Sequence, residues 1–142
     1  MKNKKLIIGY ARTPNRFPSL NLPFKFGSRL MERKIEISVE DCNLFEKFTG
    51  LMFSRREKAK ILLFSFRRKQ KIAIHSFFVF YSFLAVWLDD NNKIVDIKAV
   101  KPFQPCISPK KDSYKLVEIP INRKNKKILK FFGDSVVKKQ NI

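Results

Sequence analysis

The strongest constraint on the fold is an apolar run near the middle of the chain. Phe83-Leu84-Ala85-Val86-Trp87-Leu88 is apolar at odd and at even positions alike. Neighbouring side chains of a strand point to opposite faces, so both faces of this strand must be shielded from water. The run therefore predicts a central strand of a sheet or of a closed barrel, with Trp87 buried in the core.

The flanking sequence predicts further strands. Ile35, Ile37 and Val39 alternate with polar residues, which is the pattern of a half-buried strand. Other strands are expected at 60–66, 72–80, 93–100, 114–119 and 135–137. The polar run 67–71 is expected to be a hairpin loop, and Asp89–Asn92 a turn.

Two short helices complete the predicted elements. One is expected after Asp41 and ends at Gly50, and residues 51–53 follow it as a core plug; the other covers 122–131. Mostly sequential strands with one or two short helices predict a mainly β (β-rich α+β) fold. We expect a compact, single-domain, partly closed antiparallel barrel.

Residues 1–32 differ in pattern from the rest of the chain. Pro14, Pro18 and Pro23 interrupt every period, and basic residues stand among phenylalanines. This segment is expected to be an extended basic arm in front of a β-rich domain over 33–142. Its phenylalanines are expected to pin the arm to the domain; stacking on nucleic-acid bases is the alternative.

Four blocks in the middle of the chain resemble a known family. They are Gly50-Leu51-Met52-Phe53, Ile74-His75-Ser76-Phe77-Phe78, Phe83 to Asp89, and Lys101-Pro102-Phe103. Their order and spacing are similar to those of the domain of unknown function 192 family, over about residues 35–137. The resemblance implies a small β-rich single domain and brings no assigned activity. One departure lies at Phe78–Tyr81, where many members carry Trp-Met-x-Asn.

The charge of the chain points to a polyanionic partner. Lys and Arg number 31 against 12 acids, for a net charge of +19, and such a surface attracts phosphate backbones. A compositional bias of the whole proteome is the alternative explanation. Two clusters are the densest: Arg55, Arg56, Lys58 and Lys60, and Arg67, Arg68, Lys69 and Lys71. We expect these clusters to bind RNA or another polyanion without enzymatic activity.

His75 carries the alternative hypothesis of a small-molecule pocket or a weak enzyme. It is the only histidine, and a nucleophilic relay would have to include it. The adjacent Ser76 would point to the opposite face of a strand, so no catalytic residue is assigned. The pocket hypothesis places His75 with Lys101 and Tyr114. A third hypothesis is a protein-interaction adaptor that docks through the Pro102–Pro109 loop.

Metal and cofactor motifs are absent from the sequence. Cys42 and Cys106 form no CxxC pair and are expected to be free thiols. The glycines are isolated, which excludes a phosphate loop and a dinucleotide fingerprint. No segment approaches the ~20 apolar residues of a membrane span. We therefore expect a cytoplasmic protein without metal or cofactor.

Overall fold

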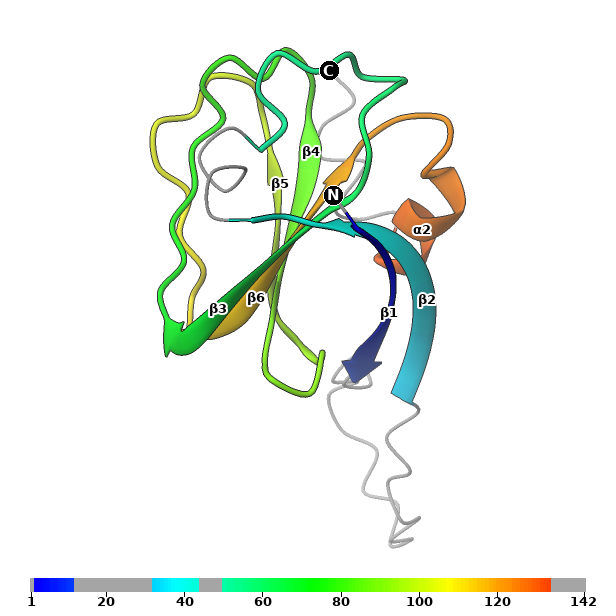
Figure 1. Cartoon of the computed structure of the whole chain (residues 1–142), viewed down its shortest axis with the longest axis vertical. Helices are drawn as coiled ribbons and strands as arrows, with labels where there is room; N and C mark the ends of the chain where they lie inside the picture. Colours follow the sequence, from blue (N-terminus) through cyan, green and yellow to red (C-terminus); the bar gives the residue numbers. More distant parts are fainter. Residues whose placement is uncertain (1, 12–31, 44–49, 134–142) are drawn as a thin grey trace, which may run out of the picture.

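The computed structural model describes residues 2–11, 32–43 and 50–133 (Figure 1). Strands of one sheet dominate the secondary structure of these ranges, and a short helix follows the last strand. The elements are β1 (Lys2–Ala11), β2 (Glu32–Asp41), β3 (Leu62–Gln70), β4 (Phe83–Leu88), β5 (Ile94–Val100), β6 (Ser113–Pro120) and α2 (Lys126–Phe131).

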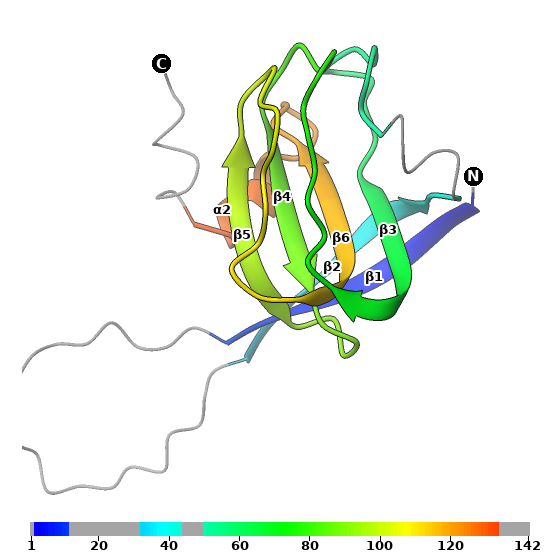
Figure 2. The same cartoon turned by 90° about the vertical axis from the view of Figure 1, so that its left-hand side faces the viewer.

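The strands form one curled sheet in the order β1-β2-β3-β6-β4-β5. Neighbouring strands are antiparallel except β2 and β3, which pair in parallel through Glu40 and Asp41. Figure 2 shows β3, β6, β4 and β5 side by side, with β1 and β2 crossing behind them. The amide of Gly9 on β1 donates to the carbonyl of Asn92, 3.1 Å away, in the β4–β5 turn. The sheet is a half-barrel, which confirms the predicted mainly β, partly closed fold.

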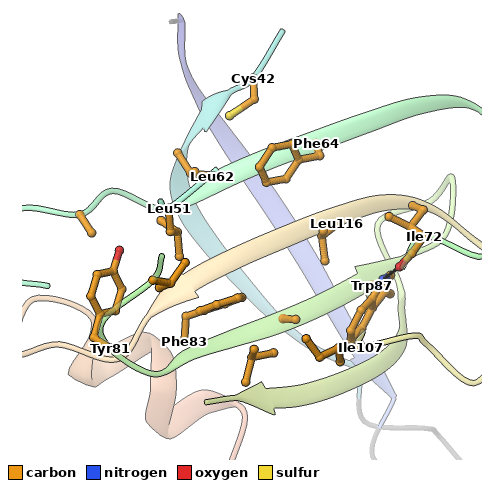
Figure 3. Close-up of a cluster of buried hydrophobic side chains, with 14 residues drawn as sticks. Cys42, Leu51, Leu62, Phe64, Ile72, Tyr81, Phe83, Trp87, Ile107 and Leu116 are labelled. Carbon is orange, nitrogen blue, oxygen red and sulfur yellow. Dashed lines mark hydrogen bonds between the residues drawn. The ribbon is translucent and has the colours of Figure 1, made fainter. Parts of the chain in front are cut away.

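β4 lies between two hydrophobic clusters, one on each face of the sheet. Phe83, Ala85 and Trp87 belong to the first cluster, which also takes buried residues from the 50–60, 72–81 and 101–109 segments (Figure 3). The alternate residues of β4 belong to the second cluster, together with β1, β2 and α2. Both parities of β4 are therefore buried, as the sequence predicts. Trp87 is fully buried, and its Nε1 donates to the Ile72 carbonyl at 2.8 Å.

β1 differs from the expectation of an extended arm. Residues 2–11 pair with the whole of β2, from Lys2 opposite Asp41 to Ala11 opposite Glu32. Leu6 and Ile8 point into the second cluster, whereas Ile7 between them is exposed. The alternation of buried and exposed side chains in β1 covers only Leu6 to Ile8 and follows several lysines, so the sequence pattern does not reveal a strand. The remainder of the expected arm, the helix expected after Asp41 and the strand expected at 135–137 lie wholly or mostly outside the described residues.

Two predictions in the middle of the chain are corrected. β3 continues through the expected hairpin loop, so Arg67, Arg68 and Lys69 lie on a strand. Residues 72–80 form no returning strand; Ile74 alone makes an isolated bridge, to Ile107. The physical reason is that β3 pairs with β6, while the 101–107 loop satisfies the backbone groups of the 74–79 segment.

Candidate functional site

Three loops at one end of the sheet expose phenylalanine rings to solvent. The loops cover 51–54, 76–80 and 101–104. Phe53 is 70% exposed, although the sequence predicts it as part of a core plug. We call the following set the phenylalanine surface: Phe53, Phe77, Phe78, Phe80 and Phe103. Exposed aromatic groups in such a cluster are uncommon on a protein surface and mark interaction sites.

Ring contacts and backbone hydrogen bonds connect the three loops. Phe53 and Phe78 are stacked, with ring centroids 5.1 Å apart, and Phe80 meets Phe103 edge-on at 5.4 Å. The amide of Phe53 donates to the carbonyl of Phe78 at 2.9 Å, and that of Phe103 to the carbonyl of Ser76 at 3.0 Å. The phenylalanine surface is therefore a fixed arrangement of rings.

Ser76 connects the 76–80 loop to the 101–104 loop through hydrogen bonds. Its side chain is fully buried. Its Oγ donates to the carbonyl of Lys101 at 2.6 Å and accepts from the amide of Gln104 at 2.7 Å. Its own amide donates to the carbonyl of Gln104 at 2.9 Å. The serine next to the only histidine thus has a structural role.

The backbone is strained where it presents the rings. Phe53, Phe78 and Phe103 have φ angles of 57°, 58° and 60°. The left-handed region is a true outlier for a bulky side chain, and each such residue costs about 1–3 kcal/mol. Conformations of this kind persist where the surrounding structure imposes them, and they cluster at functional sites.

The loops that carry the phenylalanine surface contain no acid. Segments 50–56, 71–82 and 101–111 include no Asp or Glu. Arg55, His75 and Lys101 are exposed there, and within the described residues none of them forms a salt bridge. This end of the molecule is consequently both aromatic and positively charged.

A pocket of about 490 Å³ opens beside the phenylalanine surface. Its rim includes the exposed side chains of Lys71 and His75, and the His75 ring lies 5.3 Å from the Phe77 ring. Met52 and Val79, the neighbours of Phe53 and Phe78, also line it. The complete lining is Gly50, Leu51, Met52, Phe66, Gln70, Lys71, Ile72, Ala73, Ile74, His75, Val79, Phe83 and Glu118. We call it the Glu118 pocket.

Glu118 supplies a buried carboxyl group to this pocket. On β6 it has the parity of Leu116, so it points to the face of the first cluster, and only 6% of the residue is exposed. Burial raises its pKa to about 8, because the charged form loses hydration. Among the described residues the carboxyl has no hydrogen-bond partner. The raised pKa favours the protonated form of Glu118 at pH 7.

Gly50 leaves room for the Glu118 carboxyl. Gly50 has a φ of +45°, and a Cβ at this position would lie 3.3 Å from Glu118 Oε2. Tyr81 lies on the same side, where its hydroxyl is 2.5 Å from Ser54 Oγ. Burial, and then the charge of Glu118, raise the pKa of Tyr81, while the Ser54 hydrogen bond lowers it. A side chain at position 50 would crowd this arrangement.

Of the pocket residues predicted from the sequence, only His75 lines the Glu118 pocket. The amide of Phe77 donates to His75 Nδ1 at 3.3 Å. Lys101 and Tyr114 lie outside the lining. Sequence analysis overlooked Glu118, because the flanking apolar residues Val117 and Ile119 lie on the opposite face of β6 and give Glu118 the pattern of a solvent-facing residue. The only signal on its own face is the apolar Leu116, two residues before it.

The structure divides the two basic clusters between several surroundings. Lys60 forms a salt bridge with Glu40. Arg56 donates from Nε to the carbonyl of Ile121 at 2.7 Å, and with Arg123, Lys126 and Lys130 it lines a second groove of about 300 Å³. Arg55 and Lys58 are exposed in the loop before β3. Arg67, Arg68 and Lys69 are exposed on the end of β3 that leads to Gln70 and Lys71 at the Glu118 pocket.

Other site classes find no support in the part of the chain that the structure describes. Within it, no three His, Cys, Asp or Glu residues are grouped to hold a metal ion. Cys42 is buried, Cys106 is exposed, and both are free thiols. None of the described helices is long and apolar enough to cross a membrane.

Two solved structures share the fold of this chain. A Sinorhizobium meliloti 1021 protein, described as a candidate transcription regulator, aligns with a TM-score of 0.57 and 18% identity, over 68% of this chain and 78% of that one. A Novosphingobium aromaticivorans DSM 12444 protein of unknown function aligns with a TM-score of 0.55 and 12% identity, over 67% and 70%. At these identities the likeness concerns the fold alone.

Sequence comparison gives the family. No curated protein matches the chain significantly. The DUF192 family, described as "Uncharacterized ACR", matches residues 28–134. This range contains all four blocks that resemble the family and most of the chain. The protein therefore belongs to the DUF192 family.

Proposed function

We propose that the protein is a non-enzymatic domain that binds single-stranded RNA through the phenylalanine surface and the cations around it. The observation that carries the proposal is the cluster of exposed rings on loops without acids. Proteins that bind single strands combine aromatic platforms for bases with positive groups for phosphates. Both components occur together at this end of the molecule.

The rings are arranged as stacking platforms. Phe53 is 70% and Phe80 62% exposed, so large parts of both rings face solvent. Bases of any sequence can stack on such rings, since every base has a π-face. The strained backbone at Phe53, Phe78 and Phe103 supports the proposal. Packing alone would favour burying these rings, and strained conformations that expose a side chain instead are typical of functional sites.

Charge selects the kind of partner. A net charge of +19 opposes association of this surface with a second copy of the chain. A polyanion gains from the same charge through counterion release. Arg55 and Lys101 are the cations nearest in sequence to the rings. From the rim of the Glu118 pocket, Lys71 and then Arg67, Arg68 and Lys69 would extend the phosphate contacts, with Arg56, Lys58 and Lys60 adding longer-range attraction.

The test is fluorescence anisotropy with a labelled single-stranded RNA of mixed sequence. We expect a Kd of about 10⁻⁴ to 10⁻⁶ M near physiological salt. Phe53→Asn combined with Phe103→Asn should weaken binding about tenfold or more, because each stacked base contributes ~1–3 kcal/mol. Asn tolerates the left-handed backbone, so these changes keep the loops folded.

Ile7→Asn is the matched control. Ile7 is 53% exposed on β1 and lies outside the loops, so its replacement should leave RNA affinity unchanged. Equal affinities for wild type and the double phenylalanine variant would contradict the proposal. Sedimentation with phosphatidylserine vesicles, without RNA binding, would show instead that the rings contact a membrane.

A further inference from the structure

We propose that the Glu118 pocket holds one nucleotide of the bound strand, with the base edge on the Glu118 carboxyl and the phosphate at Lys71. The inference rests on the proposed function, because the strand delivers the nucleotide. It adds a second mode of contact, in which one base is read along its hydrogen-bonding edge while others stack on the surface.

The lining of the pocket suits a flat ring with a polar edge. Apolar side chains, among them Leu51, Phe66, Ile72 and Phe83, make up most of the wall. Its volume of about 490 Å³ lies in the range of sites for small ligands. Among the described lining residues, Glu118 is the buried polar group, and apolar walls with few placed polar groups are typical of ligand sites.

The hydrogen bonds of a neutral carboxyl match those of a base edge. A protonated carboxyl offers an O–H donor beside a carbonyl acceptor. Adenine and cytosine present a ring-nitrogen acceptor beside an amino donor, and guanine and uracil a carbonyl acceptor beside an N–H donor. Burial keeps Glu118 in this neutral form at pH 7. Among the described residues no hydrogen bond to this carboxyl competes with a ligand, and pairing a desolvated group with a hydrogen-bond partner is favourable.

The rim of the pocket favours an anionic end on the ligand. Lys71 is exposed at the rim, and segments 50–56 and 71–82 contain no acid to attract a cation. An amine ligand would pair with ionised Glu118, but it would have to approach through positive potential on a protein of net charge +19. A base that carries a phosphate satisfies both ends of the pocket.

The pocket lies where a bound strand would pass. Met52 and Val79 line it and are chain neighbours of Phe53, Phe78 and Phe80. The His75 ring, at the rim, packs against Phe77. Proteins that recognise single-stranded RNA commonly splay a base out of the stack and bind its edge. The pocket therefore adjoins the loops that carry the phenylalanine surface.

The test is isothermal titration of the full-length protein with cytidine 5′-monophosphate. Cytidine and ribose 5-phosphate, each of which lacks one end of the ligand, serve as comparison probes. We expect the nucleotide to bind more tightly than either fragment. If ribose 5-phosphate binds as tightly as the nucleotide, the base edge is not recognised and the inference is overturned.

Two variants of Glu118 separate hydrogen bonding from burial. Glu118→Gln keeps a donor beside an acceptor, whereas Glu118→Leu removes both. Glu118→Leu should weaken nucleotide binding about tenfold or more, the scale of a lost bidentate base contact. Glu118→Gln should retain most of the affinity; loss with Gln, or retention with Leu, overturns the inference. Circular dichroism checks that both variants are folded.

The pH dependence gives a readout independent of folding. The wild type should lose affinity for cytidine 5′-monophosphate as pH rises through about 8, where Glu118 ionises and loses its donor, and Glu118→Gln should not. The strand residues opposite Glu118, Leu62 and Ala85, do not titrate. The titratable groups near it are Tyr81, Cys42 of the same cluster, and Lys71 and His75 at the rim. A wild-type affinity that rises through pH 8 would indicate an amine site and contradict the inference.

The two proposals fail separately. Phe53→Asn with Phe103→Asn should weaken RNA binding and leave the affinity for the free nucleotide unchanged. RNA binding without nucleotide binding overturns the pocket inference alone. Nucleotide binding in a protein that does not bind RNA contradicts the proposed function, and with it the strand as the source of the nucleotide.

Discussion

At the scale of single residues, the groups that local physics disfavours gather around one end of the molecule. Glu118 is a carboxyl without a hydrogen-bond partner in the described chain, and Phe53, Phe78 and Phe103 have left-handed backbones. Trp87, by contrast, is buried with its indole N–H bonded to a carbonyl. Violations of local preference are expected at functional sites, which agrees with the position of the Glu118 pocket and the phenylalanine surface.

Glu118 should make the stability of the protein fall with rising pH. Below its ordinary pKa of 4.5 it is protonated in the folded and unfolded states alike, so its ionisation has no effect on stability there. Between 4.5 and about 8 the unfolded chain ionises while the folded protein stays protonated, and the free energy of unfolding declines. The full loss is on the order of 5 kcal/mol and is complete above pH 8.

Urea unfolding of wild type and Glu118→Gln across pH 4 to 9 measures this contribution. The difference between the two proteins isolates Glu118 from the other titrating groups. The variant should gain stability relative to wild type as pH rises through this window. A constant difference would mean that Glu118 has an ordinary pKa in the folded protein.

Trp87→Ala should destabilise the protein by roughly 3–5 kcal/mol, because a large ring in a fully covered strand leaves a cavity. Phe80→Ala provides the comparison, since Phe80 is exposed and its loss should cost less than about 1 kcal/mol. Denaturant unfolding, followed by circular dichroism, gives both values. Similar losses for the two variants would show that Trp87 is not in the core.

The sequence identifies part of the candidate site and misses its centre. His75 stands out as the only histidine, and the structure places it at the pocket rim. Glu118 in Val-Glu-Ile-Pro resembles the solvent-facing position of a half-buried strand. Its burial follows from loops distant in sequence that cover the sheet at this point, a contact that periodicity does not report.

At the scale of elements, the sequence predicts correctly those strands whose apolar residues coincide with the buried positions, and it is wrong where apolar residues are exposed or a strand is charged. β4, β5 and β6 carry apolar residues where the core lies, so their existence was predictable. β3 was predicted too short, because its second half is exposed and charged. The 72–80 segment is apolar enough to imitate a strand, yet Phe77, Phe78 and Phe80 are exposed. Function, rather than packing, is the proposed reason for this apolar run.

β1 should contribute to stability through one face only. Ile8 is fully buried in the second cluster, so Ile8→Ala should cost about 2–5 kcal/mol. Ile7 on the same strand is exposed, and Ile7→Ala should change stability by no more than about 0.5 kcal/mol. Chemical denaturation of the two variants tests the register of β1 directly. Equal effects, or a larger loss for Ile7, would place β1 outside the fold.

At the scale of the whole molecule, both faces of the sheet are covered, and the candidate binding surface lies on loops at one end of it. The second cluster joins β1, β2 and α2 to one face, and the loops that carry the phenylalanine surface cover the other. Lys5–Glu36 and Lys60–Glu40 are two of the ion pairs on the surface. Cations outnumber acids by 19, and this net charge attracts a polyanion whichever of them are paired.

The central claim is that RNA binds across the phenylalanine surface and the exposed cations near Gln70 of β3, which lie at opposite ends of the sheet with the Glu118 pocket between them. Composition alone would make every basic surface equivalent. Two triple variants, each removing three exposed cations, separate these alternatives. One is Arg67→Ala, Arg68→Ala and Lys69→Ala at the end of β3. The other, called the α2 variant, is Arg123→Ala and Lys124→Ala just before α2 with Lys127→Ala in its first turn.

The most direct test is the slope of log affinity for single-stranded RNA against log salt, measured for wild type and both triple variants. The slope should fall in magnitude by about 2 for the β3 variant, or ~0.7 for each lost phosphate contact. The α2 variant should keep the wild-type slope. Equal reductions in both variants, or none in the β3 variant, would contradict a localised binding surface and leave the positive charge as a property of composition.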